Sequence, residues 1–192
     1  MGPCAAWPKV RISRLLEHDG LVANPVFDAV QTVLAVREYD DREIPDDVLH
    51  RIVEAAHLSA SSMNRQPWHF VVVRSRADLE QLGRMVKTGP YIALAAAAIV
   101  VAHERESRFG VSDASRAVQS MVLTAWADGV GSNWSGFGGL EEVREHLGIP
   151  DRYDVLTVVP LGYPRRAVGR GRKNRKPLGD VVSEGRFGQP YR

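Results

Sequence analysis

The part of the sequence that most constrains the fold is a polar stretch between two apolar segments. Residues 59–68 read SASSMNRQPW and combine hydroxyls, amides and a proline-fixed turn. Residues 45–57 begin with proline and carry apolar residues at the spacing of a helix that buries one face. Residues 69–73, HFVVV, have the length and composition of a buried strand. A helix, a polar loop and a strand in succession predict a ligand-facing loop, although loops of this composition are often simple turns.

The rest of the chain alternates in the same way between helical and extended patterns. We expect further helices over residues 26–36, 75–86, 113–128 and 140–147, and further strands over residues 98–102 and 155–161. Ser75 suits a helix N-cap, and the apolar face of residues 113–128 is broad enough for a central, buried helix. Alternating helices and strands predict a central sheet flanked by helices, of the α+β or α/β class.

Length and composition fit one globular domain with its own core. The chain has 192 residues, of which 44% are hydrophobic and 25% charged. We expect an N-terminal extension over residues 1–24, with a short possible helix at residues 10–17, and one folded domain over residues 25–192. The longest apolar run, residues 92–102, is too short to cross a bilayer. We also find no secretory pattern at the N-terminus, so we expect a cytoplasmic protein without a membrane partner.

Basic residues are concentrated near the C-terminus. Residues 165–176 contain seven Lys or Arg and no acidic residue, so the remainder of this chain of net charge +2 carries −5. Such a patch predicts an anionic partner, either nucleic acid or the phosphate of a ligand. A solvated basic tail is the third interpretation.

The common catalytic and metal-binding motifs are missing from the sequence. It has no GxSxG, GxxxxGK[ST] or HExxH pattern, and a single cysteine, Cys4, excludes an intrachain disulfide and a cysteine-cluster metal site. Gly129 and Gly131 begin a dinucleotide-like pattern, but Trp134 stands where a glycine is required. If the protein is an enzyme, its chemistry therefore depends on a bound organic cofactor.

Three segments together resemble the nitroreductase family of FMN-dependent oxidoreductases. They are VREYDDREIP at residues 36–45, SASSMNRQPWHFVVV at residues 59–73 and KNRKPLGDVV at residues 173–182. The resemblance extends over residues 26–182. It implies an α+β fold whose central, mixed and mainly antiparallel sheet is flanked by helices, in a homodimer with two flavins at the interface. It also implies ping-pong transfer of hydride from NAD(P)H, through flavin N5, to an acceptor such as a nitroaromatic or a quinone, with no catalytic acid or base from the protein.

The same resemblance implies specific flavin contacts. Arg37 matches the basic residue that approaches N1 and O2 of the flavin, and Ser135-Gly136 matches the loop whose backbone lies against N5 and O4. The flavin-contacting serines and asparagine of the second subunit are matched by Ser61, Ser62 and Asn64. The phosphate-binding element is matched by Lys173 and Arg175. For Arg37, a surface salt bridge with Glu38 or Asp40 is the simpler alternative. Trp134 and Phe137 are expected near the ring or in the core.

One departure from the family concerns the cofactor phosphate. Members commonly carry Arg-Arg-Ser or Arg-His-Ser where this chain has Val33-Leu34-Ala35. Because these three side chains cannot hydrogen-bond, we expect weaker FMN binding. The departure keeps a second hypothesis open, in which the protein binds another flavin-like ligand, such as a deazaflavin, or no cofactor. A nucleic-acid-binding protein that uses residues 165–176 is a further alternative, but the chain lacks an aromatic-rich basic face.

Overall fold

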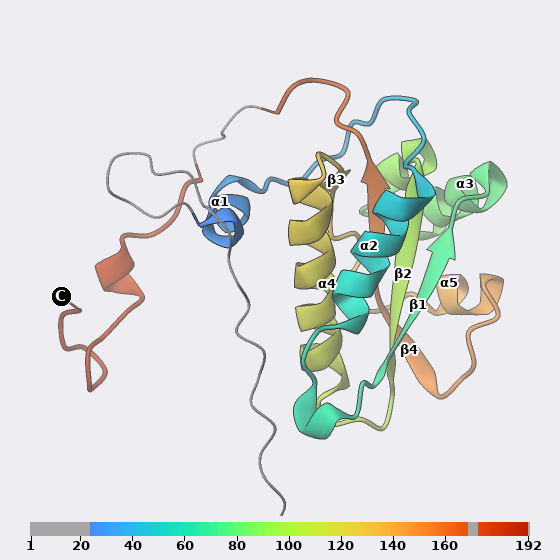
Figure 1. The fold of residues 1–192 in the computed structure, drawn as a ribbon. Coiled ribbons are helices and arrows are strands. Elements are labelled where there is room, and N and C mark those ends of the chain that lie inside the picture. The colour runs from blue at the N-terminus through green and yellow to red at the C-terminus, as the bar shows by residue number, and fades with distance from the viewer. Residues whose placement is uncertain (1–23, 169–172, 192) are drawn as a thin grey trace, which may run out of the picture.

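The computed structural model describes residues 24–168 and 173–191. Its centre is a four-stranded antiparallel sheet of order β1-β2-β4-β3 (Figure 1). The strands are β1 (Trp68–Val73), β2 (Ala97–Glu104), β3 (Gly131–Ser132) and β4 (Tyr153–Gly162). The helices are α1 (Pro25–Thr32), α2 (Asp46–His57), α3 (Arg76–Met85), α4 (Gly110–Ala127) and α5 (Glu141–His146), with short 3₁₀ turns at Ser62–Asn64, Pro90–Leu94 and Leu178–Asp180.

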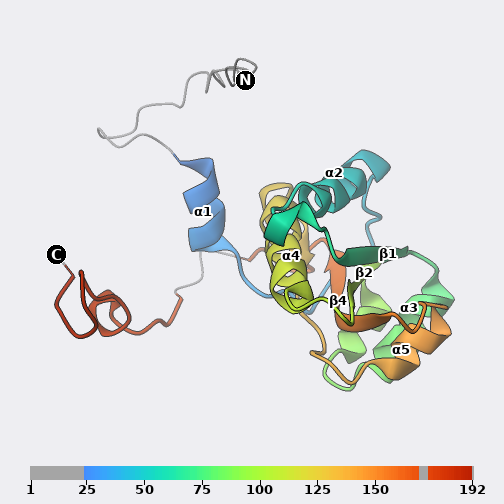
Figure 2. The same cartoon turned by 90° about the horizontal axis from the view of Figure 1, so that it is seen from below.

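Helices cover both faces of the sheet because both faces of its central strand are apolar. Side chains of a strand alternate between faces, so Ile99 and Val101 of β2 pack with α2 and α4, whereas Ala98 and Val100 pack with α3 and α5. Figure 2 shows these helices on opposite sides of the strands. The expected α+β class, with a mainly antiparallel sheet flanked by helices, is confirmed. No helix within the described residues is long and apolar enough to cross a bilayer.

The predicted elements inside the layers are confirmed within a few residues. Helix α4 is the expected central helix, and α3 begins where predicted, with the Asp78 N–H donating to the Ser75 Oγ at 3.4 Å. The short strand β3 was not predicted. The expected helix at residues 10–17 lies outside the described residues.

The first helix requires a correction. We expected it to run to Val36 with an apolar face in the core, but it ends at Thr32 and buries none of its residues. The chain becomes extended at Val33 because Ala35 pairs with Ser132 of β3 in an isolated parallel bridge. Phe27 remains 59% exposed. Residues 33–36, which continue the helical pattern in the sequence, therefore run along the edge of the sheet and not in the helix.

Candidate functional site

Arg37 is presented by a segment that is anchored on both sides. Before it, the Val36 N–H donates to the Ser132 carbonyl at 2.9 Å. After it, the buried Tyr39 donates its hydroxyl proton to the Val36 carbonyl at 2.8 Å. Tyr39 lies against Gly162, where a Cβ would be 2.7 Å from its ring. The side chain of Arg37 itself is exposed, so a fixed backbone presents a cation that a ligand can reach.

A buried polar cluster lies beside Arg37. Its guanidinium carbon is 5.8 Å from the centroid of the Tyr91 ring, a cation–π distance. The Tyr91 hydroxyl is 3.0 Å from the Ser135 Oγ and also accepts a hydrogen bond from the Asn133 amide. The structure therefore brings two of the predicted site residues, Arg37 and Ser135, into one cluster through Tyr91.

The backbone at Ser135-Gly136 is largely committed to internal hydrogen bonds. The N–H and carbonyl of Ser135 pair with Val158 of β4, both at 2.9 Å. The Gly136 N–H donates to the Thr88 hydroxyl at 3.2 Å, which is a long bond to a rotatable partner. A φ of +72° favours glycine at position 136. A ligand that accepts a hydrogen bond from the Gly136 N–H would therefore compete with the Thr88 hydroxyl for this donor.

A cavity of about 520 Å³ borders Gly136. Trp134, Phe137 and Lys87 also line it. The two aromatic rings are 6.1 Å apart, and Phe137 is 70% exposed. The Trp134 Nε1 is buried and has no hydrogen-bond partner within the described residues. This cavity therefore offers an aromatic wall and one exposed cation, and its Trp134 carries an unused donor.

The predicted residues of the 59–67 loop lie away from the Arg37 cluster, beside the first turn of α4. The Ser62 N–H donates to the Asp113 Oδ2 at 3.0 Å, and the Ser61 Oγ accepts from the Gln66 N–H at 2.9 Å. Asn64 is exposed. The loop is thus attached to α4, with part of its polar surface free.

The length of α4 separates this loop from Arg37. Asp113 lies in its first turn, whereas Trp126 near its end donates to the Thr32 hydroxyl at 2.9 Å, next to the segment that carries Arg37. Trp126 follows Asp113 by thirteen positions, which span about 20 Å at 1.5 Å per residue. Figure 1 shows the two groups at opposite ends of the helix. Within one chain, Ser61, Ser62 and Asn64 do not meet Arg37 and Ser135.

The two basic residues predicted at the phosphate lie on the α1 side of the molecule. The Lys173 Nζ donates to the Val30 carbonyl at 2.5 Å, at the end of α1, and Arg175 is exposed. Arg170 and Arg172 lie outside the described residues. Val30 precedes Val33 by three residues. The contact therefore places Lys173 near the first of the three positions at which the family resemblance leads us to expect polar side chains.

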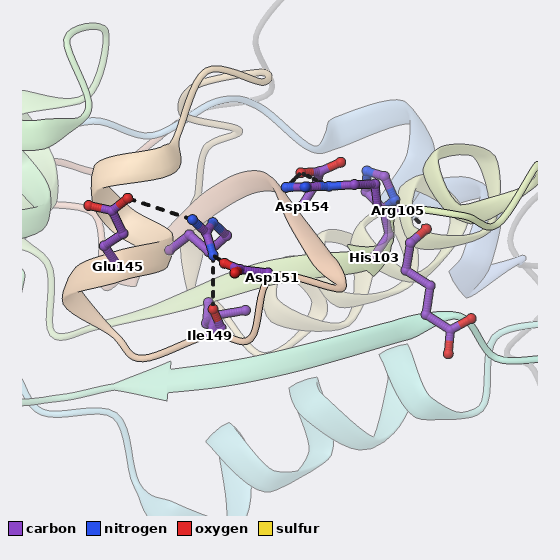
Figure 3. A network of polar contacts seen from close by, with 8 residues as sticks. His103, Arg105, Glu145, Ile149, Asp151 and Asp154 are labelled. Atoms are coloured by element: carbon purple, nitrogen blue, oxygen red, sulfur yellow. Dashed lines mark hydrogen bonds and ion pairs between the residues drawn. The ribbon is translucent and has the colours of Figure 1, made fainter.

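A second polar region was not predicted from the sequence. Arg105 and Asp154 pair at the ends of β2 and β4, and Arg144 of α5 pairs with Asp151 (Figure 3). The hydrogen bond to Asp154 raises the pKa of Arg105. A cavity of about 400 Å³ here is lined by His103, Arg144 and Asp154, among others. Because Arg105 and Asp154 are 49 positions apart, no local pattern signals their pairing.

Comparison with known proteins identifies the family. A model of the nitroreductase family matches residues 34–93 and 83–163. The chain belongs to this family. A relative from Methanothermobacter thermautotrophicus, described provisionally as an NADH dehydrogenase/NAD(P)H nitroreductase, is 34% identical over 172 residues, which cover 85% of this chain and 90% of the relative.

Two solved structures of nitroreductases share the fold. An FMN-dependent nitroreductase from Clostridium difficile is 25% identical, with a TM-score of 0.78 over 84% of this chain and 99% of that one. A protein from Desulfovibrio desulfuricans, described provisionally as a nitroreductase and solved in complex with FMN, is 28% identical, with a TM-score of 0.73 over 86% of this chain and 99% of that one. The chain thus matches nitroreductases over almost their whole length.

The burial of Tyr39 predicts a pH dependence of stability. Desolvation raises the pKa of its hydroxyl above the ordinary value, with a smaller contribution from Tyr91 and an opposing one from Arg37. The stability that this shift provides is fully present below about pH 10, and it is lost at higher pH, where the unfolded chain releases a proton that the folded protein retains.

We therefore expect the unfolding free energy to fall more steeply between pH 9 and 11 in the wild type than in Tyr39→Phe. At pH 8 the variant should be less stable by about 1 kcal/mol, because it lacks the hydrogen bond to Val36. Urea denaturation of both proteins across this range measures the difference. Parallel pH curves would contradict the assignment.

Proposed function

We propose that the protein is a homodimeric, FMN-dependent oxidoreductase that takes hydride from NAD(P)H and passes it to an acceptor such as a nitroaromatic or a quinone. The observation that carries the proposal is the division of the predicted flavin residues into two groups at opposite ends of α4. Each group is ordered by its own contacts, and neither forms a site alone. Two copies related by a two-fold axis, with their α4 helices antiparallel, would bring the two groups together at two equivalent sites.

Related proteins support the choice of cofactor and co-substrate. The names of the Clostridium difficile and Desulfovibrio desulfuricans proteins include FMN, and that of the Methanothermobacter relative includes NAD(P)H. When bound, FMN would supply the hydride-transfer chemistry, so the chain itself needs only to bind and orient the ligands and to control access to them.

Several residues of the chain fit FMN. The exposed guanidinium of Arg37 suits the negative charge that develops at the N1/O2 edge on reduction. The indole N–H of Trp134 has no acceptor among the described residues and can serve as a donor to a ligand in the cavity that Trp134 and Gly136 line. Gly136 has no side chain to block a ring. Lys173, beside the end of α1, offers a cation for the phosphate. Val33, in contrast, offers nothing to the phosphate.

Exposed apolar surface supports the dimer. Val26, Phe27 and Val30 of α1 are 69%, 59% and 43% exposed, and they form an apolar surface that none of the residues 24–168 and 173–191 covers. Figure 1 shows the C-terminal segment lying away from the layers, and Phe187 in this segment is fully exposed. Contiguous apolar surface of this kind marks a contact with another chain. We infer that a second copy covers it.

The proposal predicts a yellow protein of about twice the chain mass that oxidises NAD(P)H in the presence of a quinone. Lys173→Ala with Arg175→Ala should weaken FMN binding about 100-fold or more, because each charged hydrogen bond to a phosphate contributes about 1.5–3 kcal/mol. Quenching of flavin fluorescence during titration of the apoprotein measures the affinity. The control is Arg166→Ala with Arg186→Ala, which removes two exposed arginines and should leave the affinity unchanged.

A wild type that binds no FMN would contradict the proposal, and the hypothesis of a deazaflavin-like ligand or no cofactor would replace it. If FMN binds but both double variants lose it equally, the exposed arginines and lysines act through their overall charge and not through a phosphate contact at Lys173 and Arg175.

The missing triplet generates a separate prediction. Val33→Arg with Ala35→Ser restores family residues at a half-buried and an exposed position, so both side chains have room. We expect a gain in FMN binding of roughly 1–3 kcal/mol. The same titration measures it, with Val33→Gln as a polar but uncharged control. Nanomolar binding by the wild type with no gain in the variant would mean that other residues already hold the phosphate.

A further inference from the structure

The loop that contains Ser61, Ser62 and Asn64 has a strained backbone. Met63, Asn64 and Gln66 have φ values of 51°, 53° and 52°, in the left-handed region that residues other than glycine rarely adopt. Three such residues within four positions disfavour this conformation relative to an ordinary turn. Something outside the loop must therefore hold it.

Asp113 is the strongest outside contact of this loop. Its carboxylate is 0% exposed, and the Oδ2 accepts a hydrogen bond from the Ser62 N–H at 3.0 Å, immediately before Met63. The Oδ1 pairs with the Arg116 guanidinium, which is one turn further along α4. A buried carboxylate is costly unless it is paired and hydrogen-bonded, and both conditions are met here. The first turn of a helix also favours negative charge.

A second, weaker contact joins the start of the loop to the same helix. The Ser59 Oγ donates to the Ser120 Oγ at 2.7 Å. Ser120 is partly exposed, so water competes for this hydrogen bond, whereas Asp113 is fully buried. Asp113 therefore determines where the strained part of the loop lies, and Ser59 only limits where the loop begins.

We propose that Asp113 is a positioning residue for the flavin site of the opposite copy: by accepting the Ser62 N–H it sets the conformation in which Ser61, Ser62 and Asn64 are offered. The carboxylate is fully buried, so it acts through the loop and not on the flavin. This inference rests on the proposed function, because only in a shared site does the loop meet a flavin.

Two substitutions separate positioning from charge. Asp113→Asn keeps an acceptor oxygen at the same reach but removes the charge that pairs with Arg116. Asp113→Glu keeps the charge but moves the carboxylate by one methylene, so it no longer matches the Ser62 N–H. The control is Asp128→Asn, which neutralises another carboxylate at the far end of α4 that pairs with Arg51 and contacts no part of the loop.

Two measurements are made on the full-length protein. One is the FMN dissociation constant, and the other is the hydrogen-exchange rate of the Ser62 amide, which needs no flavin. Positioning predicts that Asp113→Asn stays within about threefold of the wild type in both, and that Asp113→Glu raises both about tenfold, as expected for loss of one hydrogen bond of about 1–1.5 kcal/mol. Asp128→Asn should change neither.

Larger effects for Asp113→Asn than for Asp113→Glu would overturn the proposal, because charge and not geometry would then matter. Faster exchange at Ser62 with unchanged FMN affinity would also overturn it, because the loop would not belong to the flavin site. If the wild type binds no FMN, the proposed function fails, and the exchange rate alone still tests whether Asp113 sets the loop.

Discussion

The packing of α4 against the sheet and α2 is the constraint on which the rest of the structure depends. Small buried residues on this helix, among them Ala114, Ala117 and Ala125, let it lie close to its neighbours, and Val118 and Met121 fill the space between them. The helix is therefore a rigid spacer. It holds the 59–67 loop at one end and the Arg37 cluster at the other, about 20 Å apart.

This separation explains why the two groups of predicted flavin-binding residues do not meet within one chain. A flavin has two ends with different needs, a phosphate that requires cations and a ring whose N1/O2 edge becomes negative. Arg37 and Lys173 can serve these needs on one copy. In the proposed homodimer the hydroxyls and amide of the loop come from the second copy, and the apolar surface of α1 that the described residues leave exposed supports this arrangement.

The sequence predicted the layers well because their signals are local: apolar residues recur at helical spacing in α4, and Ser75 can cap α3 without help from distant residues. The end of α1 was mispredicted because Ala35 pairs with Ser132, almost a hundred positions away, and tertiary pairing overrides propensity. The family resemblance supplied the candidate site, which no periodicity indicates. Asp113 was missed because a single acidic residue in the first turn of a helix is typical of an exposed position.

A mixed dimer tests most directly whether the flavin site is shared between two copies. One chain carries Arg37→Ala with Lys173→Ala, the other carries Ser61→Ala with Asn64→Ala, and different affinity tags allow the mixed dimer to be purified. Each parental dimer should lose its flavin, because both of its sites are damaged. The account predicts that the mixed dimer regains one flavin per two chains, since one site then combines the two intact halves. A mixed dimer as empty as its parents would show that each site lies within a single chain and would contradict the account.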